Sequence, residues 1–347
     1  MSTRTYFIAV VFAAMLCQPL QAADKLVISN WDAYMPPDLL ENFTQETGIE
    51  TELAVHATNE EIMGKLTANG GRGYDIVFVS SPFAEALDKL GLAALLDPAK
   101  IPNLANLYPQ ARRLPYDPGN TFSIPYAWGT TGLCYRSDLV SGTPSSWNDL
   151  LQPTAELDGK ITMLATERWL LAAGFLSLGY SINTTSPQEI EATKNALIAA
   201  KKHLLAFDDA TFYSKLVSGE ALLTHAWDGW CNYGILEDDN IRYVVPDEGT
   251  DLWVDTLVVM SASRNKDAAH QFVNYVLSAE VGKWVAENIL YKTPNQVAME
   301  SLSPALFEQF PNMAFDPVDM LNYEMLRDLG RTQRDYTRAA TEIMAAN

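Results

Sequence analysis

The chain has few of the residues on which enzymes and metal sites most often depend. Its 347 residues include four histidines and three cysteines. We find no H-E-x-x-H, no Walker phosphate-binding loop, no G-x-G-x-x-G and no G-x-S-x-G. A catalytic interpretation therefore has no positive support. A carboxylate pair for glycoside hydrolysis stays open, because acidic residues are abundant and their spacing in space is unknown.

Positive charge is also scarce. There are 24 Lys and Arg side chains against 43 Asp and Glu, which gives a formal net charge of −19 at pH 7. Such a surface repels nucleic acid and anionic lipid and concentrates cations around the protein. We therefore expect no nucleic-acid partner. Solubility alone would explain the same excess, so the acidity does not identify a ligand.

Long hydrophobic runs are absent with one exception, at the start of the chain. A short run from Tyr6 to Leu16 follows the positive charge of Arg4, and small residues then allow cleavage after Ala22 or Ala23. This pattern is typical of a secretory signal peptide, here residues 1–23, and the run is shorter than the ~20 apolar residues of a membrane span. A retained membrane anchor is the alternative.

Only Cys134 and Cys231 remain after the expected cleavage. In an oxidising compartment they could form one disulfide, and two buried thiols are equally consistent with the sequence. They do not predict a zinc site, because no neighbouring His or Cys completes a set of four ligands. We expect neither a metal nor another cofactor.

Strand and helix patterns alternate between Lys25 and Gly91. "KLVISNW", "IETELAV" and "YDIVFVS" are typical of strands, and the segments between and after them are typical of helices, the second of which we expect Asn59 to cap. This spacing indicates βαβ units and a parallel sheet, in which ligands bind beyond the carboxyl ends of the strands. Trp31 to Tyr34 and Ser80 to Phe83 fall at such ends.

The second half contains the same mixture. A helix is predicted after Ser186, where Pro187 and Glu189 complete an N-terminal capping pattern. "GEALLTHAW" and "LWVDTLVVM" predict strands, and residues 265–289 predict one long amphipathic helix. No flexible linker is visible, which indicates two lobes between which the chain crosses more than once, at residues 123–132 and 248–255.

Four separate segments combine aromatic rings with carboxylates: "NWDAY", "HAWDGW" and "DLWVD" pair a Trp with an acid, and "ILYKTPN" adds a Tyr. Any one pair is better explained by a core Trp and a solvated acid. An aromatic face attracts an ammonium group and packs against methylenes, while a carboxylate binds the ammonium through a charge-assisted hydrogen bond. Several pairs at strand ends therefore favour a flexible alkyl amine as the ligand.

The chain resembles the spermidine/putrescine-binding proteins of bacterial ABC importers, which have the type II periplasmic binding fold. The resemblance covers nearly the whole chain after residue 23 and is carried by "NW-x-x-Y-x-PP" (30–37), "SIPYAWGTTG" (123–132), "LGYSINTTSPQEIEA" (178–192), "WVDTLVV" and "YKTPN". It implies two α/β lobes, each a mixed sheet flanked by helices, with the ligand in the cleft between them. The implied lobes are 24–130 with 256–292, and 131–255 with 293–347.

The resemblance also implies a set of ligand-binding residues. Asp255 would bind an amine through its carboxylate. Ser80 and Ser81 would be the small polar residues of the site that follow the third strand. The aromatic walls of the cleft would be Trp31, Tyr34, Trp227, Trp253 and Tyr291.

The acidic positions of the family are changed in this chain. In the family an acid usually precedes the tyrosine that corresponds to Tyr34; here Ala33 stands at that position, and the acid is one residue earlier, at Asp32. On an extended segment, a shift of one residue reverses the direction of the side chain. Thr166 and Trp169 occupy the places of two further family acids, and Pro82 replaces an aromatic residue. Further candidates for the binding site are therefore Asp32, Phe83, Glu167, Trp169, Asp209 and Asp228.

The sequence thus predicts a non-enzymatic, monomeric periplasmic protein that captures a polyamine and presents it to the permease of an inner-membrane ABC importer. A closed clamp could equally be recognised by a membrane signalling receptor, which is one alternative. Another is a binding protein for a different solute; an anion would require a cleft cation, for which Arg168 is the local candidate. A secreted hydrolase is the remaining alternative.

Overall fold

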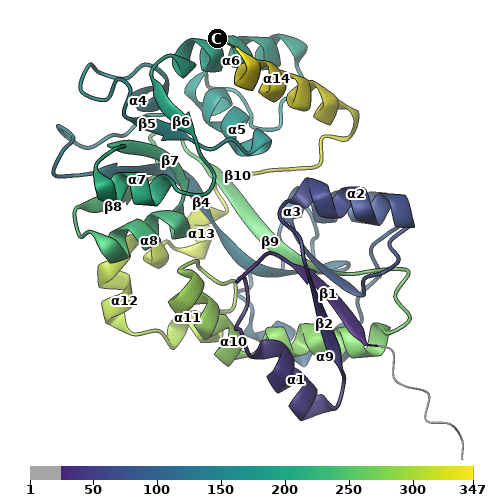
Figure 1. Ribbon diagram of the computed structural model, residues 1–347. Coiled ribbons are helices and arrows are strands. Elements are labelled where there is room, and N and C mark those ends of the chain that lie inside the picture. The colour runs from purple at the N-terminus through teal and green to yellow at the C-terminus, as the bar shows by residue number, and fades with distance from the viewer. Residues whose placement is uncertain (1–24, 347) are drawn as a thin grey trace, which may run out of the picture.

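Two α/β lobes, joined by strands that run through both, make up this computed structural model, which describes residues 25–346 (Figure 1). The expected signal peptide therefore lies outside the described residues. Within residues 25–346, no helix is both long enough and apolar enough to cross a bilayer.

The strands are β1 (Leu26–Asn30), β2 (Thr51–Val55), β3 (Ile76–Ser80), β4 (Ser123–Arg136), β5 (Ile161–Met163), β6 (Leu204–Phe207), β7 (Leu223–Trp227), β8 (Ile241–Val244), β9 (Asp251–Val259) and β10 (Glu324–Met325). The helices are α1 (Leu39–Thr47), α2 (Asn59–Asn69), α3 (Ser81–Lys89), α4 (Asn148–Leu151), α5 (Glu167–Ser177), α6 (Pro187–Lys201), α7 (Phe212–Ser218), α8 (Asp228–Glu237), α9 (Lys266–Val276), α10 (Ala279–Trp284), α11 (Gln296–Glu300), α12 (Pro304–Gln309), α13 (Pro317–Met320) and α14 (Gln333–Ala345). Short 3₁₀ turns and one π-helical turn, at Val285–Ile289, complete the described elements.

The first lobe is built on the predicted βαβ units. β1 pairs in parallel with β2 on one side and with β3 on the other. All five residues of β3 are buried, as expected for a strand that is covered on both faces. β9 pairs with β3 in the antiparallel direction, so the sheet is mixed. The predicted fold class is thereby confirmed.

Two long strands connect the lobes. The first part of β4, residues 123–130, pairs with β9, and its second part, residues 131–135, pairs with β7 of the second lobe. In Figure 1, β4 and β9 run side by side from one lobe toward the other. The expected crossing segment 123–132 lies within β4, and residues 251–255 of the other, 248–255, lie on β9. A third connection passes through β10, which pairs with the start of β9 and precedes α14.

The second lobe has its own hydrophobic core. β5 lies between β6 and β7 in parallel with both, and α5, α6 and α14 pack together against this part of the sheet. Phe175 and Tyr336, from α5 and α14, are fully buried with their ring centroids 5.3 Å apart. Within the proposed segment 293–347, α14 therefore lies in the second lobe. α11 contacts α10, which belongs to the proposed first-lobe segment 256–292, and the lobe boundaries stay a prediction.

Two local predictions were wrong. The helix cap before α2 is Thr58, whose hydroxyl accepts from the backbone of Glu61, rather than Asn59. The long helix expected over residues 265–289 breaks into α9 and α10. Ser278 adopts an extended conformation there and caps α10, and the amide of Asn295 donates to the carbonyls of Leu277 and Ser278. A side chain from a later segment thus satisfies the backbone groups that the break leaves open.

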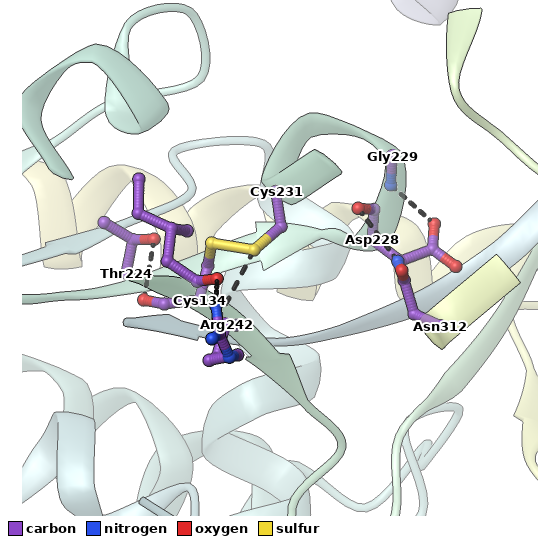
Figure 2. Close-up of a disulfide and its surroundings, with 8 residues drawn as sticks. Cys134, Thr224, Asp228, Gly229, Cys231, Arg242 and Asn312 are labelled. Atoms are coloured by element: carbon purple, nitrogen blue, oxygen red, sulfur yellow. Dashed lines mark hydrogen bonds between the residues drawn. A yellow bond between two sulfur atoms is a disulfide. The ribbon is translucent and has the colours of Figure 1, made fainter. Parts of the chain in front are cut away.

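The structure joins Cys134 and Cys231, a pairing that the sequence left undecided. The two Cα atoms are 5.8 Å apart, and both cysteines are buried. Figure 2 shows the bond between β4 and α8, beside the turn that carries Asp228 and Gly229. The disulfide therefore attaches the first turn of α8 to one of the two strands that connect the lobes.

Replacing both cysteines, Cys134→Ala with Cys231→Ala, should lower the free energy of unfolding by roughly 3–5 kcal/mol, because the bond closes a long loop in the unfolded chain. The residues are 97 apart in sequence. Urea unfolding of the oxidised protein and of the double variant measures the difference. Wild-type protein unfolded in excess thiol is the control and should match the variant. Equal midpoints for the oxidised protein and the variant would contradict this expectation.

Candidate functional site

A cavity of about 540 Å³ lies where the strand ends of the two lobes meet. Seven of its lining residues are aromatic and five are carboxylates, while none is Lys, Arg or His. The aromatic residues are Trp31, Tyr34, Trp169, Trp227, Trp230, Trp253 and Tyr291, and the carboxylates are Asp32, Glu60, Glu167, Asp209 and Asp255. Ala57, Thr58, Asn59, Ser80 and Thr166 complete the wall. Apolar faces and negative charge are the two properties that this lining offers to a ligand.

Asp255 is held in the cavity by neutral donors alone. Its Oδ1 accepts a hydrogen bond from the Ser80 hydroxyl at 2.7 Å, and its Oδ2 accepts one from the Tyr34 hydroxyl at 2.8 Å. Burial raises the pKa of Asp255 above its ordinary value, and these two hydrogen bonds counteract part of that rise. The carboxylate is therefore fixed in position but has no positive partner, which is the state in which a cationic ligand gains most from contacting it.

The orientation of Ser80 is fixed by α2. The Asn59 side chain accepts from the Ser80 backbone N–H at 2.9 Å and donates to the Ser80 hydroxyl at 3.1 Å. Ser80 therefore keeps its own hydrogen for Asp255. The sequence led us to expect that Asn59 caps α2. It does not, because its side chain turns toward the cavity and hydrogen-bonds with Ser80 instead.

The aromatic residues form two groups along the cavity. In the first, Trp31 meets Tyr34 edge-on with centroids 5.4 Å apart, and Trp253 meets Tyr291 in the same way at 4.9 Å. In the second, Trp169 and Trp227 cross at 85° with centroids 5.6 Å apart. Perpendicular pairs of this kind present ring faces and edges to the cavity, and these suit both methylenes and an ammonium group.

Trp169 is held in the cavity wall by a hydrogen bond. Its indole N–H donates to Asp251 at 3.1 Å, which ties the ring to the beginning of β9. The ring of Tyr291 packs directly against Gly229. A Cβ atom at that position would lie 2.1 Å from the ring, so the close approach requires a glycine. Both rings are buried except where they face the cavity.

Asp32, one of the candidates from the sequence, lines the same cavity as Tyr34, although a one-residue shift on an extended segment would have reversed its direction. The prediction assumed an extended segment, whereas the structure has a turn, in which Ala33 adopts a left-handed conformation with φ of 52°. This conformation costs roughly 1–2 kcal/mol for a residue other than Gly. The turn brings the displaced acid back to the cavity wall. Asp32 is exposed and adds a solvated charge to the cavity lining.

Asp228 does not belong to the ligand cavity, which corrects the sequence-based assignment. It is 1% exposed and forms an ion pair with Lys292, which is 2% exposed. Its oxygens also accept from the backbone N–H groups of Thr130 and Gly229. The Lys292 ammonium donates to the carbonyl of Asn312 as well. This carboxylate is already fully satisfied by the protein.

Three further candidates also lie outside the cavity lining. Ser81 is the buried first residue of α3, and Phe83 packs against the larger hydrophobic core, which includes residues of both lobes. Arg168, the only local cation proposed for an anion, is 3% exposed and donates to the carbonyl of Arg327 and the side chain of Asn183. It therefore stabilises the third connection between the lobes, and within residues 25–346 the cavity lining contains no Lys, Arg or His.

The second lobe contributes two acids with different surroundings. Both oxygens of Asp209 accept hydrogen bonds from the loop before α5, from the backbone of Ala165 and Thr166 and from the Thr166 hydroxyl. Glu167 accepts a hydrogen bond from the Gln333 amide, and hydrogen bonding to Thr337 and Gln333 favours its ionised form. Burial raises the pKa of Glu167, and the negative charge of Glu60 adds to that rise.

Sequence reasoning missed five lining residues: Ala57, Thr58, Asn59, Glu60 and Trp230. The first four follow β2 directly, at a carboxyl strand end, so the rule that marked Trp31 and Ser80 applies to them as well. Trp230 could have been found from its place within "HAWDGW". Among the described residues, no three His, Cys, Asp or Glu side chains gather closely enough to hold a metal ion.

The two-lobe mixed-sheet fold and its interlobe cavity define the class of type II periplasmic binding proteins. Residues 38–313 match the family of bacterial extracellular solute-binding proteins, and the chain belongs to this family. It is 34% identical over 323 residues to the spermidine/putrescine-binding periplasmic protein of Escherichia coli, with 93% of this chain and 92% of the relative covered.

Two further comparisons agree with this assignment. A putrescine/cadaverine-binding protein of Pseudomonas aeruginosa is 28% identical over 327 residues, with 90% of this chain and 91% of the relative covered. The solved structure of a spermidine/putrescine ABC transporter substrate-binding protein from Streptococcus pneumoniae superposes with a TM-score of 0.79. That protein is 31% identical, and the match covers 92% of this chain and 98% of the other.

Asp228→Asn should lower the free energy of unfolding by about 3–5 kcal/mol, because it leaves the Lys292 ammonium buried without a counter-charge. Lys292→Met should destabilise the protein for the converse reason. The double variant should be more stable than either single variant, since it buries no unpaired charge. Chemical denaturation measures all three. Single variants that lose less than about 1 kcal/mol would show that the pair behaves like an exposed salt bridge.

Proposed function

We propose that this protein is a non-enzymatic periplasmic binding protein that captures a polyamine between its lobes. The observation that carries the proposal is the cavity lining, which combines seven aromatic residues and five carboxylates with no basic side chain. An alkyl amine has the complementary structure, with charged nitrogens separated by apolar methylenes. The names of the relatives in Escherichia coli and Pseudomonas aeruginosa support the same class of ligand.

In this proposal the ring faces pack against the methylenes, and Asp255 binds one ammonium group. The Ser80 and Tyr34 donors keep both oxygens of Asp255 oriented, so little reorganisation is needed when the ligand arrives. The ligand supplies the positive charge that no lining residue provides. Closure of the lobes then removes the rings and the methylenes from water together.

The proposal extends to the compartment and the partner. Residues 1–23 would direct export to the periplasm, and the closed, loaded form would be recognised by the permease of an ABC importer, as the name of the Streptococcus pneumoniae relative suggests. A membrane signalling receptor that recognises the same closed form is the alternative partner. A monomeric state remains a prediction.

Asp255→Asn should weaken polyamine binding by roughly 30-fold or more, because it removes the charge from a buried charge-assisted contact. Calorimetric titration of refolded, ligand-free protein against putrescine, cadaverine, spermidine, norspermidine and spermine measures the loss. Asp88→Asn is the matched control: it removes the same charge from an exposed site on α3 of the same lobe and should bind like the wild type. Equal affinities for wild type and Asp255→Asn would exclude the proposed contact.

Polyamine affinity should fall on acidification. The pKa values of Asp255 and Glu167 are both raised by burial, so these carboxylates take up protons at a higher pH than exposed acids do. The cation binds the ionised form, and the amines stay charged from about pH 7.5 to about pH 5, so protonation of the protein alone weakens binding. Titrations across this range should show a dissociation constant that rises as the pH decreases. Asp255→Asn should show a flatter dependence, and a constant affinity in the wild type would contradict the expectation.

A further inference from the structure

The segment "DLWVD" contains two carboxylates, of which only Asp255 lines the ligand cavity. Asp251, Trp253 and Asp255 alternate along β9, so their side chains lie on the same face of the strand. Strand residues rise about 3.3 Å each, which places Asp251 about 13 Å from Asp255 along the strand. Asp251 therefore shares a face with the ligand-binding carboxylate but is too far away to contact the same ammonium group.

Trp169 stands between Asp251 and the cavity. The Asp251 carboxylate is 1% exposed, and its Oδ2 accepts the hydrogen bond from the Trp169 indole N–H at 3.1 Å. Trp169 is the third residue of α5. The next two residues, Leu170 and Leu171, pack in the core of the second lobe, whereas Trp169 packs in the larger core together with Trp253. The hydrogen bond therefore joins a helix of the second lobe to the strand that carries Asp255.

Asp251 is a strong acceptor for the indole. Burial raises the pKa of Asp251 to about 6, the negative charge of Asp228 adds to that rise, and the hydrogen bond from Trp169 opposes it. The carboxylate is therefore mostly ionised at about pH 7.5. A hydrogen bond to an ionised acceptor is stronger than one to a neutral acceptor. It also polarises the indole, which increases the attraction of the ring face for a cation.

We propose that Asp251 is a positioning residue for polyamine binding: it holds the Trp169 ring in the cavity wall and does not itself contact the ligand. This inference rests on the proposed function. The Trp169 and Trp227 rings cross at 85° with their centroids 5.6 Å apart. Without Asp251 the indole N–H would be buried and unpaired, which favours a rotation of the ring toward another acceptor. The perpendicular pair would then have to be restored when the ligand binds, at the expense of affinity.

Two other roles for Asp251 make different predictions. If its charge attracted the ligand from a distance, Asp251→Asn and Asp251→Ala would weaken binding equally, and they would do so whether or not Trp169 can donate a hydrogen bond. If Asp251 only stabilised β9, its replacement would lower the unfolding temperature and leave the affinity of the folded protein unchanged. A positioning role makes the loss depend on the acceptor and on the indole N–H.

The test is a double-variant cycle across this hydrogen bond, measured by calorimetric titration with putrescine and spermidine. Asp251→Ala removes the acceptor and should weaken binding about tenfold, whereas Asp251→Asn keeps an acceptor oxygen and should lose less than about threefold. Trp169→Phe keeps an aromatic ring and removes the N–H. In that background, Asp251→Ala should cost less than about twofold. Asp239→Asn, at an exposed position of the second lobe, is the control and should bind like the wild type.

Nuclear magnetic resonance of the indole N–H groups gives a second measurement, in the ligand-free protein. The Trp169 signal is the one that disappears in Trp169→Phe, and it should shift upfield in Asp251→Asn because the acceptor is weaker. This measurement decides the question even if Asp251→Ala does not fold. An unchanged Trp169 signal in Asp251→Asn would overturn the inference.

Equal losses of affinity in Asp251→Asn and Asp251→Ala would also overturn the inference, as would a loss that persists in full in the Trp169→Phe background. These results are compatible with the proposed function as long as Asp255→Asn still weakens binding. A wild-type protein that binds neither amine would overturn the proposed function, and this inference with it.

Discussion

The buried ion pair between Asp228 and Lys292 is the contact around which the cavity is built. A charge at such a depth is tolerated only with a partner and further hydrogen bonds, so its geometry is closely constrained. Asp228 binds the backbone of β4 and begins α8, while Lys292 belongs to the segment that follows α10. Tyr291 directly precedes Lys292, and its ring lies over Gly229. The pair thus fixes one wall of the cavity from behind.

Asp228 and Asp255 show how surroundings give two similar carboxylates different functions. Asp228 directly follows Trp227 at the end of β7, and Asp255 follows Trp253 by two residues within β9. Asp228 has a lysine, two backbone donors and no opening toward the ligand space. Asp255 has two hydroxyl donors and faces the cavity. The first is therefore part of the scaffold, and the second retains the capacity to bind a cation.

The sequence could predict the strand–helix alternation, the crossing segments and most of the aromatic wall, because these follow from periodicity and from residues at strand ends. It could not separate Asp228 from Asp255, since the lysine that decides between them is 64 residues away from Asp228. The position of Asp32 depended on a single left-handed residue, Ala33, for which alanine gives no signal. The break between α9 and α10 depended on Asn295, a side chain from a later segment.

The electrostatics of the cavity also explain its excess of acids. α2, α3, α5 and α8 all begin beside it, and the positive ends of helix dipoles favour anions. A cationic ligand therefore needs enough negative charge to outweigh these helix ends as well as to replace its own hydration. Asp209 illustrates the first requirement, since both of its oxygens are occupied by the loop that begins α5. Asp255 meets the second requirement, because neutral hydroxyls orient it and leave its charge uncompensated. Because the acids of the cavity have different partners, a count of acids alone does not give the length of the ligand.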